Sequence, residues 1–170
     1  VAGAHGKSTT SAMTAVILTE AGVDPTVVIG GEVASLHGNS RNGRSEFVVA
    51  EADESDGSFL KFDPYLAVIT NIENDHLDHY GTEENIYKAF KQFVDNIQLG
   101  GKAVLCMDNS TVRRLSIETK RDFVTYGLEK QDDYSAANIS YSVGTTTYDL
   151  YYKSKFLTQV TLAVPGRHNV

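Results

Sequence analysis

A short glycine-containing loop near the start of the chain has the residue types needed to bind a phosphate group. It reads Gly3-Ala4-His5-Gly6-Lys7-Ser8-Thr9-Thr10 and leads directly into a helical pattern. Backbone N–H groups of such a loop and of the helix start can surround phosphate oxygens, Lys7 adds a positive charge, and Ser8 offers a hydroxyl to Mg²⁺. The longer phosphate-loop pattern asks for another glycine where this chain has Val1. The loop predicts nucleoside triphosphate chemistry, with a simple helix-capping turn as the alternative.

A second group of candidate residues follows the apolar segment 47–50 and reads Glu51-Ala52-Asp53-Glu54-Ser55-Asp56. A carboxylate at the end of a buried strand, close to a phosphate loop, can hold Mg²⁺ on phosphate oxygens. We expect Glu51 to have this role. For Asp53 and Asp56 a solvated acidic turn is the more favoured interpretation.

A third group, Asn71-Ile72-Glu73-Asn74-Asp75-His76, follows the apolar segment 66–69. His76 and His79 lack a second Cys/His pair at metal-ligand spacing, which argues against a zinc enzyme. His76 is expected to serve a second Mg²⁺ or a phosphoryl oxygen, with a surface-loop histidine as the alternative. In open α/β sheets ligands bind beyond the carboxyl ends of the strands, so all three groups are expected at one edge of a sheet.

The hydrophobic pattern predicts a mostly parallel sheet flanked by helices, the α/β class found with phosphate loops. Short apolar runs typical of strands buried on both faces occur at 47–50, 66–69 and 102–107, and further strands are expected at 26–29 and 123–126. Helices are expected over 7–21, from Thr82 onward and around 112–117, while Gly30 to Ser45 is predicted to be a long loop.

The last third of the chain has a different residue composition. Thr- and Tyr-rich segments at 139–143, 146–152 and 156–164 predict an antiparallel meander, and Pro165 to Val170 predicts the start of another helix. The predicted fold class is therefore a parallel α/β sheet followed by an antiparallel β meander.

Composition excludes several classes of function. The 170 residues suit one domain, and the net charge of −7 argues against a general nucleic-acid-binding protein. Cys106, the only cysteine, lies in an apolar run and is expected to be a buried strand thiol. No apolar run approaches the roughly 20 residues of a membrane span, so no membrane partner is expected. No nucleophile elbow or dinucleotide fingerprint is present, which removes serine-hydrolase and NAD chemistry. A reducing, cytoplasmic setting is expected.

Four motifs occur in a fixed order: the loop at 3–10, the acidic segment 51–56, the segment 71–76, and Gly166-Arg167-His168-Asn169. Together they resemble the central ATP-binding domain of the Mur ligases, most closely the branch that joins L-alanine to UDP-N-acetylmuramate. The resemblance covers essentially all 170 residues, so the chain is interpreted as one such domain, 1–170, with the UDP-binding N-terminal domain and the C-terminal domain of the family absent.

The resemblance implies a role for individual residues. Lys7, Glu51 and His76 would be catalytic, with Ser8 and Glu51 at a first Mg²⁺ and His76 at a second. The nucleotide would be held by the phosphate loop and by the start of an adenine-contacting segment: Gly3, Ala4, His5, Gly6, Lys7, Ser8, Thr9, His168 and Asn169. The muramyl substrate would face Arg41, Glu54, Ser55 and Asp56.

The resemblance also implies a reaction. ATP and Mg²⁺ would activate the muramyl carboxylate as an acyl phosphate, which L-alanine attacks, in cytoplasmic peptidoglycan synthesis. The partners would be these small molecules and the enzyme's own two further domains, and residues 1–170 alone are expected to be unable to ligate. The alternatives are a related murein-peptide or folylpolyglutamate-type ligase, a phosphate-loop NTPase or kinase without ligation, and a nucleotide-binding module without catalysis.

Overall fold

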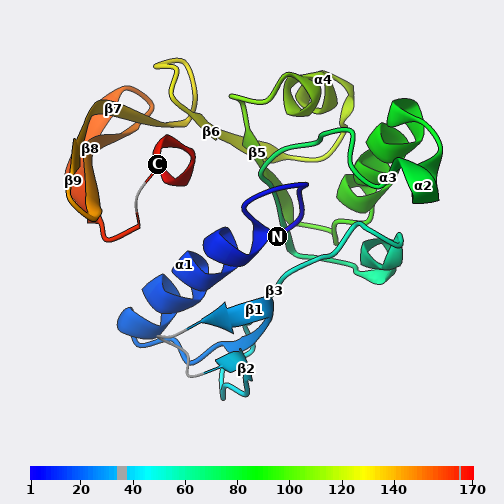
Figure 1. The fold of residues 1–170 in the computed structure, drawn as a ribbon, viewed down its shortest axis with the longest axis horizontal. Helices are drawn as coiled ribbons and strands as arrows, with labels where there is room; N and C mark the ends of the chain where they lie inside the picture. Colours follow the sequence, from blue (N-terminus) through cyan, green and yellow to red (C-terminus); the bar gives the residue numbers. More distant parts are fainter. Residues whose placement is uncertain (34–37, 165) are drawn as a thin grey trace.

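The computed structural model describes residues 1–33, 38–164 and 166–170 (Figure 1). The helices are α1 (Lys7–Glu20), α2 (Leu77–Tyr80), α3 (Glu83–Asp95) and α4 (Ser110–Glu118), with short 3₁₀ turns η2 (Ser58–Lys61) and η3 (Arg167–Asn169). The strands are β1 (Thr26–Val33), β2 (Gly38–Arg41), β3 (Val48–Ala50), β4 (Leu66–Ile69), β5 (Lys102–Cys106), β6 (Phe123–Gly127), β7 (Tyr134–Ser142), β8 (Thr145–Tyr152) and β9 (Lys155–Leu162).

The strands form two sheets, with the orders β2-β1-β3 and β4-β5-β6-β7-β8-β9. The first residues of the chain lie between them: the nitrogen of Val1 donates to the carbonyl of Ala50, and Ala2 makes a parallel bridge with Ile69. β3, β4, β5 and β6 are parallel to their neighbours, whereas β7, β8 and β9 pair antiparallel. This confirms the predicted parallel α/β sheet with an antiparallel meander toward the C-terminus.

The two faces of the parallel strands meet different partners because side chains alternate along a strand. Ala67 and Leu105 belong to the main core together with apolar residues of α3 and α4. Val104 and Cys106 instead line a cavity on the side of α1. Figure 1 shows α1 on one side of the sheet and α3 and α4 on the other.

Helix α3 illustrates why the sequence forms these elements. The hydroxyl of Thr82 accepts a hydrogen bond from the backbone N–H of Asn85, and two acidic residues occupy the first turn. Phe90 and Phe93, on its apolar stripe, pack against Phe59 of η2 with ring centroids 5.3 and 5.1 Å apart. The helix expected from Thr82 onward is confirmed.

The predicted long loop at Gly30 to Ser45 is wrong in part. β1 continues to Val33, and β2 pairs antiparallel with it, while residues 34–37 lie outside the described residues. Backbone pairing overrides the low strand propensity of this Gly-, Asn- and Ser-rich segment, because β1 offers an open edge. At the C-terminus, where a helix start is expected, the described residues after Pro165 form the single turn η3.

In the part of the chain that the structure describes, no helix is both long enough and apolar enough to cross a membrane.

Candidate functional site

The phosphate loop connects Ala2, which lies between the two sheets, to the start of α1. Gly3 has φ +146°, and a side chain there would collide with Thr70 Oγ1 and the backbone of Asn71. Gly6 is the N-cap of α1 with φ +83°, and no side chain caps the helix. The N–H groups of a helix's first turn have no partner within the helix, so this uncapped start presents donors to an anion.

Lys7 lies at the first position of α1 and is held from two sides. Its Nζ donates to the carbonyl oxygen of Gly3 at 2.8 Å and to Glu54 Oε1 at 2.9 Å. The Glu54 side chain is only 3% exposed, and its Oε2 is buried without a hydrogen-bond partner among the described residues. The ion pair and the hydrogen bond to Gly3 hold the Lys7 side chain in a fixed position.

Ser8 and Glu51 meet as the sequence predicts. The Ser8 hydroxyl lies 3.0–3.1 Å from both carboxylate oxygens of Glu51, and the backbone N–H of Gly30 donates to Glu51 Oε2 at 2.8 Å. A hydroxyl and a carboxylate are hard oxygen ligands of the kind Mg²⁺ prefers. Within the described residues no group of three His, Cys, Asp or Glu side chains could hold a metal. This donor set fits Mg²⁺ that is shared with phosphate oxygens, because such ions use one or two carboxylates and few other protein ligands.

His76 brings an imidazole ring close to Glu54. It has a left-handed backbone, φ 58°, at the N-cap of α2, and its Nε2 lies 3.8 Å from Glu54 Oε1. The hydroxyl of Tyr80 donates to the backbone carbonyl of Glu54, and burial, followed by the charge of Glu54, raises the pKa of Tyr80 to about 12. Lys7 and His76 therefore share one buried carboxylate.

Asp53 and Asp56, in the acidic segment 51–56, each accept a hydrogen bond within a local turn. Asp53 Oδ1 accepts from the N–H of Ser55 at 3.0 Å, and Asp56 Oδ1 accepts from the N–H of Ser58 at 2.8 Å. Hydrogen bonds from Ser58 lower the pKa of Asp56. Of the four residues expected to face the muramyl substrate, Glu54 is turned toward Lys7, whereas Ser55 and Asp56 stay in an adjacent turn.

Arg41 is not brought to this group. It lies on β2 opposite Val27, near the start of β1, and makes an ion pair with Asp24. Asp24 follows the C-terminal end of α1, and a helix of 14 residues is about 20 Å long. Arg41 and Lys7 therefore lie at opposite ends of α1.

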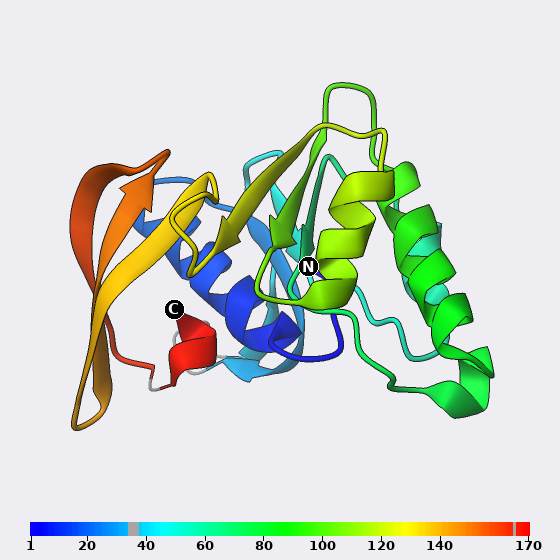
Figure 2. The ribbon, with the colours of Figure 1, turned by 90° about the horizontal axis from the view of Figure 1, so that it is seen from above.

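A cavity of about 760 Å³ extends from the phosphate loop to the C-terminal turn. Its walls come from the start of α1, from the ends of β4, β5 and β6, and from β7, β8 and η3. In both ribbon views the red C-terminal turn lies between the meander and α1 (Figures 1 and 2). His168 and Asn169 line this cavity, as do His5 and Gly6. The last predicted motif is thus brought to the same cavity as the first.

Sequence reasoning missed several strand residues of this cavity wall, including Val104, Cys106 and Tyr126. Strand alternation could have identified two of them. Cys106 is two residues beyond Val104 on β5, so both side chains lie on the same face of the sheet. Cys106 was expected to be a buried strand thiol; it does lie on a strand, is partly buried, and burial raises its pKa.

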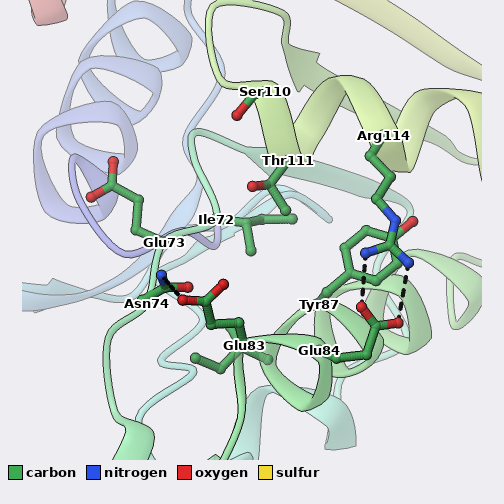
Figure 3. Close-up of a pocket in the computed structure, with 10 residues that line it drawn as sticks. Ile72, Glu73, Asn74, Glu83, Glu84, Tyr87, Ser110, Thr111 and Arg114 are labelled. Atoms are coloured by element: carbon green, nitrogen blue, oxygen red, sulfur yellow. Dashed lines mark hydrogen bonds and ion pairs between the residues drawn. The ribbon is translucent and has the colours of Figure 1, made fainter.

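A smaller cavity of about 230 Å³ lies between the segment after β4 and the starts of α3 and α4 (Figure 3). Arg114 makes two hydrogen bonds to Glu84 and lies 3.8 Å from the ring centroid of Tyr87. This network joins α4 to α3. Glu73 is also drawn in Figure 3. Its Oε2 lies 3.6 Å from Nε2 of His5, which connects this cavity to the phosphate loop.

Comparisons with known proteins agree with this geometry. The model of the Mur ligase middle domain family matches residues 1–170. The UDP-N-acetylmuramate–L-alanine ligase of Pelotomaculum thermopropionicum is 50% identical over 171 residues, covering 100% of this chain and 37% of the relative. The protein of the same name from Syntrophus aciditrophicus is 49% identical, covering 100% of this chain and 35% of the relative.

Solved structures show the same fold. The UDP-N-acetylmuramate-alanine ligase MurC of Thermotoga maritima superposes with a TM-score of 0.83 at 34% identity, over 98% of this chain and 37% of that chain. The UDP-N-acetylmuramate:L-alanyl-gamma-D-glutamyl-meso-diaminopimelate ligase of Neisseria meningitides gives a TM-score of 0.85 at 25% identity, over 98% of this chain and 55% of that chain.

This chain thus spans little more than a third of the length of the curated relatives it matches. Over that span the family model, the order of the motifs and the fold all coincide. The chain belongs to the Mur ligase middle domain family.

Proposed function

We propose that residues 1–170 form the ATP- and Mg²⁺-binding domain of an enzyme that joins L-alanine to the carboxylate of UDP-N-acetylmuramate. The observation that supports this most strongly is the convergence of Lys7, the Ser8–Glu51 pair and His76 around the uncapped start of α1. The relatives named UDP-N-acetylmuramate–L-alanine ligase, about 50% identical, support the choice of substrates.

In the proposed reaction, an oxygen of the muramyl carboxylate attacks the γ-phosphorus of ATP, which gives an acyl phosphate and ADP. The amine of L-alanine then attacks the carbonyl carbon and phosphate leaves. Both partners of the first step are anions, so positive groups must lower their repulsion. Lys7 supplies one charge, and N–H groups at the start of α1 donate to phosphate oxygens.

Ser8 and Glu51 are proposed to hold Mg²⁺, which when bound supplies positive charge at the phosphate oxygens. His76, whose Nε2 approaches the same Glu54 oxygen as Lys7, is proposed to serve the second metal. Glu54, buried between Lys7 and His76, is better placed to fix these two residues than to face the muramyl group.

The nucleoside part of ATP is proposed to occupy the 760 Å³ cavity, which the phosphate loop and His168 both line. The proposed partners are ATP, UDP-N-acetylmuramate, L-alanine and two further domains, which would bind UDP and help to bind the amino acid. Because a nucleotide sugar, ATP and a free amino acid are its substrates, the proposed setting is the cytoplasm.

The proposal is tested in a longer protein that contains these residues, by measuring phosphate release from ATP. Release that requires both UDP-N-acetylmuramate and L-alanine, and that is lost in Lys7→Ala, is the expected result. Release without the acid and the amine would indicate an NTPase instead. Release only with a muramyl acid and a peptide would favour the murein-peptide reaction named for the Neisseria structure.

A further inference from the structure

Asn71, the second residue after the strand β4, makes several hydrogen bonds to the phosphate loop. Asn71 Oδ1 accepts a hydrogen bond from the backbone N–H of His5 at 2.8 Å, and Asn71 Nδ2 donates to the carbonyl oxygen of His5 at 2.8 Å. The backbone carbonyl of Asn71 also accepts from the N–H of Ala4 at 3.4 Å. A single side chain thus satisfies both backbone groups of the residue at the tip of the loop.

A carboxamide suits this task because it has a donor and an acceptor side by side. Aspartate offers only acceptors when ionised, and serine is too short to reach both groups. The His5 side chain itself is 68% exposed, so its ring is not what fixes the loop. The loop is held by its backbone, and the holding group comes from β4.

Thr70 provides a second tether from the same strand end. Its hydroxyl donates to the carbonyl oxygen of His5 at 2.7 Å and lies 3.3 Å from Asn71 Nδ2. The close approach of Thr70 and Asn71 is possible because Gly3 has no side chain, since a Cβ there would collide with both residues. The loop and the strand end therefore fit each other at three points.

We propose that Asn71 is a positioning residue that sets the phosphate loop in its binding conformation, an inference that rests on the proposed function. The His5 N–H is used by Asn71, so the donors left for phosphate begin at Gly6 and continue into α1. Asn71 also begins the segment that ends at His76. Its side chain therefore fixes the spacing between the phosphate loop and the segment that presents His76.

The test compares wild type with Asn71→Ala, Thr70→Val and a matched control, Asn74→Ala. Asn74 is on the same segment, but its side chain bonds Glu83 and not the loop. Two quantities are measured: hydrogen exchange of the His5 amide by NMR without nucleotide, and the affinity for Mg²⁺-ATP by calorimetry. The thermal unfolding curve of each variant gives its melting temperature and the fraction folded at the temperature of these measurements.

In Asn71→Ala the His5 amide is expected to exchange at least about tenfold faster, and the affinity for Mg²⁺-ATP to fall about tenfold. Thr70→Val should shift both quantities in the same direction by less, and Asn74→Ala should shift neither. A purely structural role would lower the melting temperature and leave the affinity of the folded protein unchanged.

Equal His5 exchange in wild type and Asn71→Ala, or equal affinity in the two folded proteins, would overturn the inference. If Asn71→Ala does not fold, Thr70→Val decides by the same two readouts. A folded wild type that does not bind Mg²⁺-ATP would contradict the proposed function, and the exchange experiment alone would then decide the role of Asn71.

Discussion

Lys7 and Glu54 form an ion pair that is almost entirely withdrawn from water, with side chains 13% and 3% exposed. Such a pair contributes little net stability compared with neutral residues, but removal of one partner leaves an uncompensated charge in the interior. This asymmetry allows the stability role of Lys7 to be separated from its proposed phosphate role.

Lys7→Ala is expected to lower the free energy of unfolding by about 3 kcal/mol, because Glu54 is left buried without its partner. Lys7→Ala combined with Glu54→Gln should recover most of that loss and still fail to bind Mg²⁺-ATP. Urea unfolding and calorimetry on the three proteins measure both effects. A Lys7→Ala variant as stable as wild type would contradict this account of the buried ion pair.

Glu51 is the residue whose role depends most on the metal. Glu51→Gln keeps the shape of the side chain but weakens its affinity for a hard cation. The affinity of the Glu51→Gln protein for ATP should therefore become nearly independent of Mg²⁺. Wild type should bind ATP at least about tenfold more tightly with Mg²⁺ than with EDTA. Glu46→Gln, an exposed residue with the same charge change, is the control. Persistent Mg²⁺ dependence in Glu51→Gln would place the metal elsewhere.

At the scale of elements, α3 contributes more buried residues to the main core than any other element. The strand β4 packs in the same core, and the segment 71–76 follows the end of β4. The helix begins at a single capping hydroxyl, that of Thr82. Its formation thus supports the segment 71–76 both through β4 and through Glu83, which accepts a hydrogen bond from Asn74.

Thr82→Ala should cost about 1 kcal/mol of unfolding free energy, or about 3 °C in melting temperature, because the N–H of Asn85 loses its side-chain acceptor and keeps only the carbonyl oxygen of Thr82. Thr82→Ser keeps the hydroxyl and serves as the control. Equal losses in both variants would show that the methyl group, not the cap, matters.

The ends of β5 and β6 hold two carboxylates against the backbone of Gly127. A Cβ at Gly127 would lie 2.6 Å from Asp132 Oδ2 and 3.1 Å from Asp108 Oδ1. Asp132 Oδ2 is buried without a hydrogen-bond partner among the described residues. Burial, followed by the charge of Asp108, raises the pKa of Asp132.

A carboxyl whose pKa is raised on folding destabilises the protein as pH rises through that pKa and has no such effect below its unfolded pKa of about 4. Asp132→Asn should therefore raise the melting temperature by about 2 °C at pH 7.5 and leave it nearly unchanged at pH 3.5. The new amide can also donate to Asp108. Asp122→Asn, an exposed residue with the same charge change, is the control. A gain of the same size at both pH values would contradict this explanation.

Much of the element order follows from local sequence. The apolar runs at 66–69 and 102–107 and the cap at Thr82 specify β4, β5 and the start of α3. The strand β2 does not follow from local sequence, because its Gly, Asn, Ser and Arg residues pair with β1 through backbone groups alone.

The same distinction holds for the site. The pairing of Ser8 with Glu51 agrees with the expectation that a carboxylate at the end of a buried strand lies close to the phosphate loop. The burial of Glu54 between Lys7 and His76, and the hold of Asn71 on His5, depend on where turns place side chains from distant segments, which strand periodicity does not specify.

At the scale of the whole molecule, the turn η3 lies between the meander and α1 (Figure 2). The parallel strands, α1 and the meander line a cavity between the phosphate loop and η3. The proposed phosphate donors, the proposed metal ligands and a cavity wall thus lie within one unit. Because its relatives are nearly three times longer, ligation is proposed to need further domains, whereas nucleotide binding is proposed to need only these residues.

Titration of Mg²⁺-ATP into residues 1–170 by calorimetry tests this account most directly. We expect one nucleotide to bind per chain, with binding weakened by EDTA and abolished in the Lys7→Ala, Glu54→Gln double variant, which remains folded. A folded wild type without binding, or a double variant that binds as tightly as wild type, would contradict the phosphate-loop account.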